Sequence, residues 1–469
     1  MSPICVNFTF SDLSLPKAQL RNLEELGYHQ MTPIQASSLP TILKGGDLIG
    51  QAQTGSGKTA AFGIGLLESI DLKHFTTQGL VICPTRELAE QVRQEIRRLG
   101  RYLPNLKISA ICGGAPIRHQ IHSLSQHAPH IAVGTPGRLL DHLGRGTLDL
   151  SHTKVLVLDE ADRMLDMGFA DEVAEIIRYI PKKRQTLLFS ATFPEDIRRM
   201  SHQFQHRPKE VVVEALVENR PKISQSVVLV EDGRDKPAVT AEILYHYRPQ
   251  SSVIFCNTIA TTIEVTDFLQ RHRIDALALH GDLDQKDRDQ VLIQFSNRSC
   301  PVLVATDVAA RGLDIDDLSL VLNFDVPFDP EVYVHRIGRT GRAGKEGRAL
   351  TFSLSYKQER IEMIEAALEE QFPRIAATEL KGTPAPLHAE MVTIEINEGR
   401  KAKISAGDIL GALTANEAIS GSDVGKITLL PMKAYVAIKA PLAKVAVDQI
   451  WRRPIKGIEC RARVLRSFN

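Results

Sequence analysis

The chain lacks the sequence features of membrane proteins, of secreted disulfide-bonded proteins and of zinc-binding proteins. Its 469 residues contain one tryptophan, and no apolar run approaches the roughly 18 residues that span a bilayer. The first residues show no basic stretch followed by an apolar core, so we expect no secretory signal. The six cysteines are scattered without a C-x-x-C pair, and the fifteen histidines form no ligand-spaced cluster. We therefore expect reduced, mostly buried thiols, no structural metal, no membrane contact and a cytoplasmic location.

A strong overall charge is also missing, since the formal net charge is only +1. The charge is unevenly distributed, however, because residues 388–469 carry 13 Lys and Arg against 8 Asp and Glu. The arginines and lysine that lie close together near the end are Arg452, Arg453, Lys456, Arg461, Arg463 and Arg466. Such a segment is typical of a domain that faces nucleic acid, although a solvated basic surface has the same composition.

Length and composition indicate a globular protein of several domains. Hydrophobic residues make up 43% and charged residues 24% of the chain, and its length corresponds to about three domains of ordinary size. We place the domains at 1–208, 225–375 and 388–469, with linkers at 209–224 and 376–387. Polar residues mark the first linker, and Gly382, Pro384 and Pro386 mark the second.

Short apolar runs alternate with helical patterns in the first two domains. They lie at 79–83, 107–112, 130–133, 155–158 and 186–189, and then at 252–256, 276–279, 302–306, 320–324 and 349–354. Such continuous runs predict parallel strands buried on both faces, and therefore two doubly wound α/β domains. In the third domain we expect strands at 392–397, 426–430, 434–439 and 458–465, with a helix after the first and third. This β-α-β-β-α-β order is that of an RNA-recognition-type α+β domain.

The stretch Ala52–Thr59, which reads AQTGSGKT, lies between an apolar strand pattern and a helical pattern. Strand, glycine-rich turn and helix form the context of a phosphate-binding loop, in which backbone N–H groups point at phosphate oxygens. We expect Lys58 to reach the β and γ phosphates of a nucleoside triphosphate and Thr59 to hold Mg²⁺. The binding residues would be Ala52, Gln53, Thr54, Gly55, Ser56, Gly57, Lys58 and Thr59. The alternative interpretation is a glycine-rich turn without function. Ala52 also departs from the general phosphate-loop pattern, which begins with glycine.

Carboxylates follow the apolar run 155–158, in the sequence Asp159-Glu160-Ala161-Asp162. At the carboxyl end of a strand in the same domain, they would lie near the phosphate loop. We expect Asp159 to be the second Mg²⁺ ligand and Glu160 the base that orients water. A capped acidic turn is the alternative interpretation.

Three arginines and two glycines occur within residues 335–342, HRIGRTGR, in the second α/β domain. Arginines from a facing domain neutralise the charge that develops during phosphoryl transfer, which is worth about 10³–10⁵ in rate in other nucleotide hydrolases. An ion-pair network or an RNA-binding patch would use the same residue type.

These motifs resemble those of the DEAD-box RNA helicases, and the resemblance covers roughly residues 10–372. The further motifs that carry it are TPIQ at 32–35, PTREL at 84–88, Gly113-Gly114, TPGR at 135–138, SAT at 190–192, ATD at 305–307 and RGLD at 311–314. The family commonly has alanine at the position of Ala52. The resemblance implies two tandem RecA-like doubly wound parallel-sheet domains that hold ATP in the cleft between them.

The resemblance also implies roles for single residues. Phe10 would stack on adenine, Gln35 would read the adenine edge, Asp314 would hold the ribose, and Arg339 and Arg342 would be arginine fingers. The residues implied to couple hydrolysis to RNA binding are Asp162, Ser190, Thr192 and His335. The RNA backbone would pass Thr85, Arg86, Gly114, Thr135, Gly137 and Thr306, contacts that carry no base information.

We expect a monomeric ATPase that is stimulated by RNA and separates short duplexes, because ATP and RNA would each favour the closed arrangement of the two domains. An RNA-binding scaffold that uses ATP only to clamp is an alternative that the same residues would serve. A DNA-translocating helicase and a phosphotransferase using the same loop are further alternatives.

The last domain resembles the C-terminal RNA-binding domain of the DbpA subgroup of bacterial DEAD-box proteins. Residues 399–414, 424–430 and 433–439 carry this resemblance. It implies that the domain directs the enzyme to a hairpin of 23S ribosomal RNA, in a pre-ribosomal particle of the large subunit. Ala437 replaces the second aromatic of the usual stacking motif, so we expect RNA contacts at Arg400, Lys401, Lys403, Arg461 and Arg463 instead. A domain that only stabilises a partner interface is the alternative.

Overall fold

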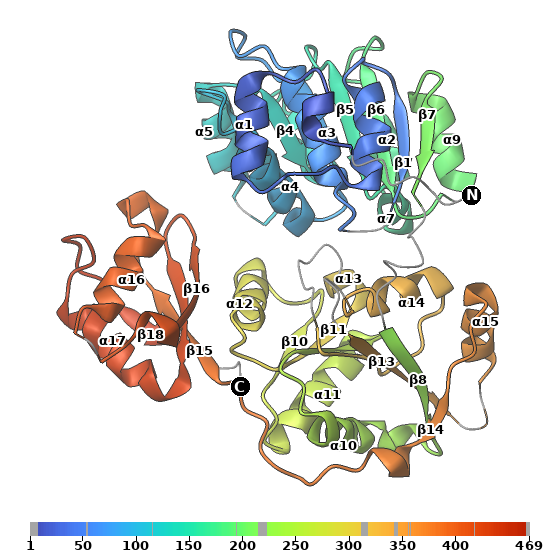
Figure 1. Cartoon of the computed structure of the whole chain (residues 1–469), viewed down its shortest axis with the longest axis vertical. Helices are drawn as coiled ribbons and strands as arrows, with labels where there is room; N and C mark the ends of the chain where they lie inside the picture. Colours follow the sequence, from blue (N-terminus) through green and yellow to red (C-terminus); the bar gives the residue numbers. More distant parts are fainter. Residues whose placement is uncertain are drawn as a thin grey trace. The chain divides into compact units, whose positions relative to one another are not determined.

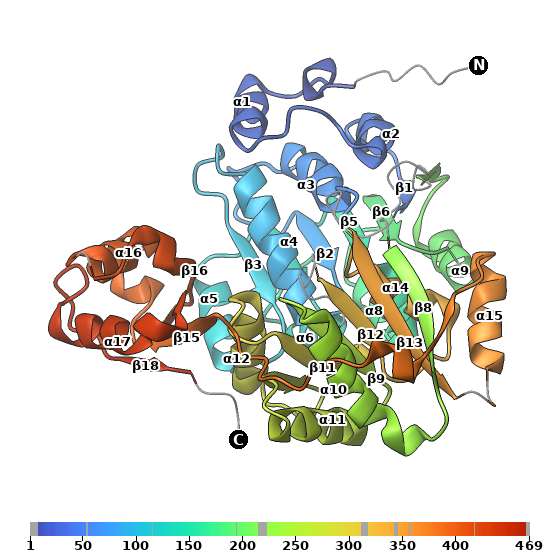
Figure 2. The same ribbon diagram turned by 60° about the horizontal axis from the view of Figure 1, so that its bottom comes forward.

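The computed structural model describes residues 8–52, 55–114, 116–193, 195–213, 223–310, 318–341, 346–354, 356, 358–416 and 418–465. The chain divides after residue 218 into two compact units (Figures 1 and 2). Within the described ranges, every helix is too short or too polar to pass through a bilayer. All five cysteines in these ranges are buried, as we expected of most thiols in the chain.

The first unit is built on a parallel seven-stranded sheet with the order β3-β4-β2-β5-β6-β1-β7. Its strands are β1 (Leu48–Gln51), β2 (Gly79–Ile82), β3 (Ile108–Ile111), β4 (Ile131–Gly134), β5 (Val155–Asp159), β6 (Gln185–Ser190) and β7 (Lys209–Val212). Its helices are α1 (Lys17–Glu25), α2 (Pro33–Ile42), α3 (Lys58–Glu68), α4 (Arg86–Leu99), α5 (Ile117–Gln126), α6 (Pro136–Gly144), α7 (Ala161–Asp166), α8 (Ala170–Ile177) and α9 (Glu195–Phe204). The apolar runs at 79–83, 107–112, 130–133, 155–158 and 186–189 therefore do form neighbouring parallel strands.

Successive side chains of the central strands pack into two separate hydrophobic cores, one on each face of this sheet. Val81, Val133 and Val157 pack with α2, α3 and α4, whereas Leu80, Ala132 and Leu156 pack with α6, α7, α8 and α9. Because side chains alternate across a strand, a strand that is covered on both faces must be apolar throughout. This explains why the central strands read as continuous apolar runs.

The second unit contains another parallel seven-stranded sheet, with the order β10-β11-β9-β12-β13-β8-β14. Its strands are β8 (Ile223–Val230), β9 (Ser252–Cys256), β10 (Ala276–Leu279), β11 (Val302–Thr306), β12 (Leu320–Asn323), β13 (Gly347–Leu354) and β14 (Arg374–Ala376). Its helices are α10 (Lys236–Tyr247), α11 (Ile259–Arg271), α12 (Gln285–Ser296), α13 (Asp307–Ala310), α14 (Pro330–Ile337) and α15 (Glu359–Leu368). Two cores again lie on opposite faces, one with α10 and α11 and the other with α12, α14 and α15.

The C-terminal domain is a four-stranded antiparallel sheet with two helices, in the predicted β-α-β-β-α-β order. Its elements are β15 (Met391–Ile396), α16 (Ala406–Thr414), β16 (Val424–Leu429), β17 (Ala434–Lys439), α17 (Ala443–Arg452) and β18 (Ala462–Val464). The sheet order is β16-β17-β15-β18. A capping box begins the first helix, since Ser405 N–H donates to Asp408 Oδ2 at 2.8 Å and Asp408 N–H donates to Ser405 Oγ at 3.2 Å. The last strand is shorter than the expected 458–465.

Two stretches that we expected to be linkers differ from that expectation. The first sheet does not end at residue 208, because β7 occupies 209–212 and pairs with β1. The second sheet begins at Ile223, within the same expected linker. Residues 376–387 lie against the second α/β domain: Leu380 and Leu387 are buried, and Arg248 Nη2 donates to Pro386 O at 3.0 Å. The sequence did not predict these segments because the strands are short or partly polar. None of the segments contains the continuous apolar run from which a buried strand is predicted.

Candidate functional site

The order of the first sheet brings three of the predicted motifs to one edge. Strands β5, β6 and β1 are neighbours, and they are parallel, so their carboxyl ends lie side by side. The glycine-rich loop follows β1, the acidic stretch begins at the last residue of β5, and the SAT stretch begins at the last residue of β6. Ligands of open α/β sheets bind outside the carboxyl ends of the strands, so this edge is the candidate site.

The glycine-rich loop has the backbone that we expected of a phosphate-binding loop. Gly55 and Gly57 have positive φ angles of 82° and 96°, in the left-handed region that favours glycine. Gly57 is the N-cap of α3, so the first N–H groups of that helix are directed at the loop. The ammonium of Lys58 is buried and donates to Ala52 O at 2.7 Å, across the loop. Gln53 and Thr54 lie outside the described residues.

Gln35 connects the TPIQ stretch to this loop. Its Oε1 accepts from Thr32 N–H at 2.9 Å, and its Nε2 donates to Gly57 O at 3.2 Å. An amide oxygen accepts twice and an amide nitrogen donates twice, so among the described residues these two bonds leave Gln35 one acceptor and one donor position. The hydroxyl oxygen of Ser56 is buried and has no hydrogen-bond partner in the described part of the chain. Such an orphaned group in a glycine-lined loop fits a polar ligand such as a triphosphate.

Phe10, which we expected to stack on adenine, is 3% exposed. Its ring lies edge-on to Tyr28, with centroids 6.1 Å apart and planes at 85°. Stacking on a base therefore requires this ring to move, and the role of Phe10 stays a prediction.

The acidic stretch is buried under the same edge. Burial raises the pKa of the Asp159 carboxyl to about 7, although the positive charge of Lys58 acts in the opposite direction. A carboxyl group held in this way gains from a nearby divalent cation, which would compensate the buried charge. Glu160 has a φ of 53° and accepts from Arg163 Nη1 at 2.8 Å, in an ion pair whose two side chains are both buried.

Asp162 holds the SAT stretch in place. Its Oδ2 accepts from the N–H groups of Ala191 and Thr192 at 3.0 and 2.9 Å and from the Thr192 hydroxyl at 3.1 Å. The Ser190 hydroxyl oxygen accepts from Asp162 N–H at 3.2 Å. Asp162, Ser190 and Thr192, three of the four residues implied to couple hydrolysis to RNA binding, are therefore in direct contact, and the coupling itself stays a prediction. Arg163, which pairs with Glu160, was not among our expected site residues, although the spacing of three residues is one at which side chains of a helix meet.

Five of the six residues expected to follow the RNA backbone lie at the other half of the same edge, where β2, β4 and β3 end, whereas Thr306 belongs to the second sheet. Thr85 follows β2 and caps α4, accepting from Leu88 N–H at 3.3 Å. The guanidinium of Arg86 lies against Gly113, because a Cβ on that glycine would be 2.7 Å from Arg86 Nη2. Gly114 follows β3 and Thr135 follows β4, while Gly137 is exposed in the first turn of α6. The structure thus brings these five residues of the first unit together, and a role in RNA binding stays a prediction.

In the second unit, the described part of the HRIGRTGR stretch, residues 335–341, forms the end of α14 and the turn behind it. Arg336, which we did not single out, is its structural centre: Nε and Nη2 donate to the carboxylate of Asp307 at 2.6 and 2.7 Å, and Nη2 also donates to Asn257 Oδ1 at 2.9 Å. Arg339 is buried and His335 half-buried in the same segment, and Thr306 ends β11 beside Asp307. Arg342 and Asp314 lie outside the described residues.

The basic residues expected to bind RNA in the C-terminal domain are all exposed. Arg400 donates through Nε and Nη2 to Leu429 O, at 2.9 and 2.6 Å, and Lys403 O accepts from Lys456 Nζ at 2.9 Å. Arg463 pairs with the buried Glu395, with Nε 3.1 Å from Oε1. Lys401 and Arg461 complete the set, and its role in RNA binding stays a prediction.

Three segments of the chain match known protein families. Residues 32–200 match the DEAD/DEAH box helicase family, residues 235–344 the helicase conserved C-terminal domain, and residues 393–464 the DbpA RNA binding domain. The chain is similar to the ATP-dependent RNA helicase DbpA of Escherichia coli strain K12, with 50% identity over 462 residues that cover 97% of this chain and 99% of the relative.

Solved structures show the same likeness. Dbp5 of S. cerevisiae bound to RNA and ADP BeF3 has a TM-score of 0.72 and 30% identity, covering 79% of this chain and 96% of that one. Mss116p bound to ssRNA and AMP-PNP has a TM-score of 0.70 and 27% identity, covering 79% of this chain and 80% of that one.

Proposed function

Since the chain belongs to the DEAD-box ATP-dependent RNA helicases and carries a DbpA-type RNA-binding domain, we propose that RNA stimulates its ATP hydrolysis, that it separates short RNA duplexes locally, and that its C-terminal domain directs it to a hairpin of 23S ribosomal RNA. The work would be done in the cytoplasm, on a pre-ribosomal particle of the large subunit.

The contact between Asp162 and the SAT stretch carries the proposal. The acidic stretch lies beside the phosphate loop, and its last carboxylate holds Ala191 and Thr192 through their N–H groups. A change at the nucleotide would therefore reach the chain segment that follows β6 through this contact. A binding protein that uses no nucleotide has no need of this connection between two motifs.

The residues present fit ATP with Mg²⁺. Lys58 and the N–H groups at the start of α3 would hold the phosphates, and Gln35, which is hydrogen-bonded to Gly57 O of the loop, would read the adenine edge. Thr59 and Asp159 would hold Mg²⁺, which supplies positive charge against the phosphate oxygens. Glu160 would orient the attacking water, and Arg339 and Arg342 would neutralise the transferring phosphoryl group.

Specific targeting rests on the C-terminal domain. The candidate RNA residues of the first unit include Gly114 and Gly137, which have no side chains with which to read bases. The exposed basic residues of the C-terminal domain, together with its match to the DbpA RNA binding domain, support the 23S hairpin as the ligand.

The first test compares ATP turnover and strand displacement by the full chain with RNA and with DNA of the same sequence. We expect RNA to stimulate ATP turnover, and we expect the chain to displace strands of an RNA duplex. Equal turnover with and without RNA would contradict the proposal, and turnover without strand displacement would identify an ATP-dependent RNA clamp.

The second test concerns the target. Turnover is measured with a 23S fragment that contains the hairpin and with a fragment of equal length whose hairpin loop is scrambled. We expect the half-saturating RNA concentration to be at least about tenfold lower for the native hairpin, since each lost base contact costs about 1–3 kcal/mol. Equal values would contradict the targeting.

A further inference from the structure

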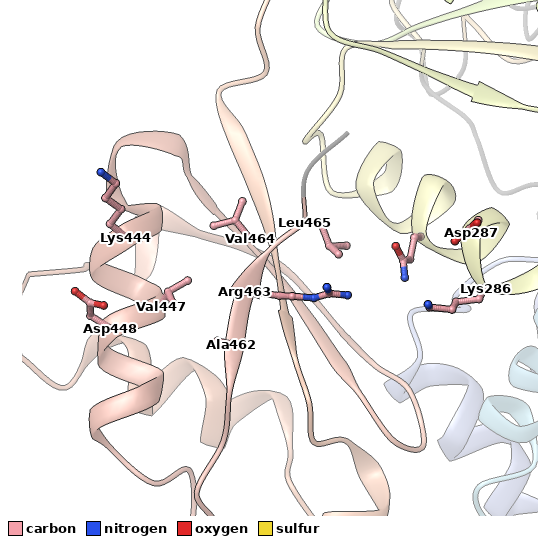
Figure 3. Close-up of a pocket in the computed structure, with 10 residues that line it drawn as sticks. Lys286, Asp287, Lys444, Val447, Asp448, Ala462, Arg463, Val464 and Leu465 are labelled. Carbon is pink, nitrogen blue, oxygen red and sulfur yellow. The ribbon is translucent and has the colours of Figure 1, made fainter. Parts of the chain in front are cut away.

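Two groups of polar side chains lie outside the nucleotide site. The first lines a groove of about 800 Å³ in the second unit, where Figure 3 shows Arg463 directed towards Lys286. Asp287 and Asp448 line the same groove, so cations and carboxylates occur together in it and select no ligand of one charge. The second group lies in the first unit, where hydrogen bonds join Gln120 to three other residues.

Gln120 connects helix α5 to the turn that follows β3. None of the residues of α5 is buried, so apolar packing holds this helix only weakly. Gln120 lies in its first turn, and its Nε2 donates to Cys112 O at 2.9 Å. Cys112 directly precedes the Gly113-Gly114 stretch. The nitrogen end of the Gln120 side chain thus holds the main chain at the start of that stretch.

The oxygen end of the same side chain binds α6. Gln120 Oε1 accepts from Arg138 Nη1 at 2.9 Å and lies 3.0 Å from His142 Nε2. Because an amide oxygen only accepts, the tautomer of His142 that carries a proton on Nε2 fits this contact. Exchange of the amide oxygen and nitrogen would place two acceptors together at Cys112 and two donors together at Arg138, so the contacts fix the amide orientation.

His142 supports this amide from the inside of the domain. Its side chain is fully buried, and burial first, then the charge of Arg138, lowers its pKa. The ring is therefore neutral at neutral pH and adds no second positive charge beside Arg138. The charge of Asp141, whose Oδ2 is 3.9 Å from Arg138 Nε, acts in the opposite direction on the pKa of His142.

Both stretches that Gln120 joins belong to the expected RNA path. Gly114 follows β3, whereas Thr135 and Gly137 follow β4. The two glycines have no side chain that could adjust to a strand, so the separation of the two stretches must be set by the residues around them. A binding site works only when supporting contacts hold its groups to within about 0.5 Å.

We propose that Gln120 is a positioning residue for RNA, which holds the turn after β3 and the start of α6 at the separation that lets both contact one strand. This inference rests on the proposed function, since it concerns the RNA path of an RNA-stimulated ATPase. The role requires no contact between Gln120 and RNA. Both acceptor positions of its oxygen are filled by Arg138 and His142, and its nitrogen is directed at Cys112.

The first measurement tests the positioning in the full chain, without RNA or nucleotide. The thiol of Cys112 belongs to the turn that Gln120 holds, and burial raises its pKa to about 12, so it should react slowly with a maleimide. Gln120→Leu has a side chain of similar size but makes no hydrogen bond. We expect it to let the turn open more often and to speed the labelling of Cys112 at least about fivefold, as measured by mass spectrometry of the peptide that contains it.

Gln120→Glu separates the two ends of the side chain. A carboxylate keeps an acceptor for Arg138 and His142, but its second oxygen would face Cys112 O, which is also an acceptor. Labelling of Cys112 should therefore become faster in this variant too. Gln126→Leu is the matched control, because it makes the same change as Gln120→Leu at an exposed position of the same helix, and it should label like the unaltered chain. Unchanged labelling in both Gln120 variants would overturn the proposal.

The second measurement tests the consequence for RNA. ATP turnover is titrated with single-stranded RNA at saturating ATP, and then with ATP at saturating RNA. Both Gln120 variants should raise the half-saturating RNA concentration at least about tenfold, because a displacement of about 1 Å can cost more than that. Their KM for ATP should change less than about twofold, since the phosphate loop follows β1, away from β3 and β4 in the sheet.

The split between RNA and ATP separates positioning from a general loss of structure. A merely structural role of Gln120 would affect both titrations or would lower the midpoint of urea unfolding, which we expect to shift by less than about 0.3 M. Gln126→Leu should match the unaltered chain in every measurement. Faster labelling of Cys112 with an unchanged half-saturating RNA concentration would overturn the role in RNA binding.

The unaltered chain tests the proposed function separately. If RNA does not stimulate its ATP turnover, the proposed function fails, and the labelling of Cys112 still decides whether Gln120 holds the turn. If RNA stimulates the unaltered chain and both Gln120 variants at the same concentration, only the present inference fails. The two failures are therefore distinguishable.

Discussion

Asp162 and Thr192 are joined by two hydrogen bonds, because Asp162 Oδ2 accepts both the main-chain N–H and the hydroxyl of Thr192, at 2.9 and 3.1 Å. Burial tends to raise the pKa of this carboxyl, but the hydrogen bonds from Thr192 and Ser190 and the charge of Lys58 hold it below its ordinary value. The carboxylate therefore stays charged. It connects the acidic stretch that begins at the end of β5 directly to the stretch that begins at the end of β6.

Removing the Thr192 hydroxyl should uncouple duplex separation from ATP hydrolysis. Thr192→Val has nearly the same shape and keeps the N–H contact, but it loses a hydrogen bond to a charged acceptor, worth about 1.5–3 kcal/mol. We expect strand displacement to fall at least about tenfold, while RNA-stimulated ATP turnover stays within about threefold. Thr192→Ser keeps the hydroxyl and should restore displacement. Equal loss of both activities in Thr192→Val would show that the contact serves hydrolysis itself.

Gly57 should not tolerate a side chain, whereas Gly137 should. At Gly57 a Cβ would lie 2.5 Å from Gln35 Nε2, and the φ of 96° strains any other residue. We expect Gly57→Ala to raise the KM for ATP at least about tenfold, since both the loop and Gln35 are displaced. Gly137→Ala meets nothing within 4 Å and should leave the KM for ATP unchanged. Steady-state ATP turnover at saturating RNA measures both, and similar KM values for the two variants would contradict the expected role of the loop.

The fold could be predicted where strands are buried on both faces. The apolar runs 252–256, 276–279, 302–306 and 434–439 coincide with β9, β10, β11 and β17. Strands β7 and β14 lie at sheet edges, where one side is unpaired and few residues are buried, so they form no continuous apolar run. In β8 the first half, Ile223–Ser226, is polar and only the second half is buried. Edge and mixed strands are specified by their partners, which a single sequence does not show.

The candidate site, like the fold, was predicted only in part from the sequence. Lys58, Asp159 and Gln35 were found because their function requires a fixed local pattern, and the structure brings all three to one edge of the first sheet. Arg336 was missed because its role depends on partners that folding brings together, Asp307 and Asn257 on other elements. Arg163 was missed although its partner Glu160 lies only three residues before it, a spacing at which side chains of a helix meet. Contacts between distant segments leave no periodicity in either segment.

Arg336 should be irreplaceable even by lysine. Its guanidinium is 2% exposed and binds Asp307 through two nitrogens, with Asn323 Oδ1 and Asp325 O at 3.2 and 2.7 Å from Nη1. One ammonium cannot reach these partners together, so Arg336→Lys leaves buried groups unpaired and should cost about 3–5 kcal/mol. Urea unfolding followed by circular dichroism measures the loss. Arg360→Lys, at an exposed position, should change the unfolding free energy by less than about 0.5 kcal/mol, and an equally small change in Arg336→Lys would contradict this prediction.

The stability of the C-terminal domain should depend on the charge of Glu395. Burial tends to raise the pKa of this carboxyl, but the hydrogen bond and charge of Lys433 and the charge of Arg463 hold it below its ordinary value of 4.5. Because the pKa is lowered in the folded domain, the stabilisation is present above the ordinary pKa and is lost as the pH falls through the folded value. Glu395→Gln should therefore cost about 1.5–3 kcal/mol at neutral pH, and the difference should shrink once the carboxyl of the unaltered protein is protonated.

The fluorescence of Trp451 reports the unfolding of the C-terminal domain, because the single tryptophan of the chain lies in that domain. Its fluorescence during urea unfolding is compared for the unaltered chain and Glu395→Gln at neutral pH and near pH 3.5. Glu459→Gln, an exposed position in the same domain, is the matched control and should unfold like the unaltered chain at both values. A Glu395→Gln defect of the same size at both pH values would show that shape and packing, rather than the charge shared with Lys433 and Arg463, account for the role of this residue.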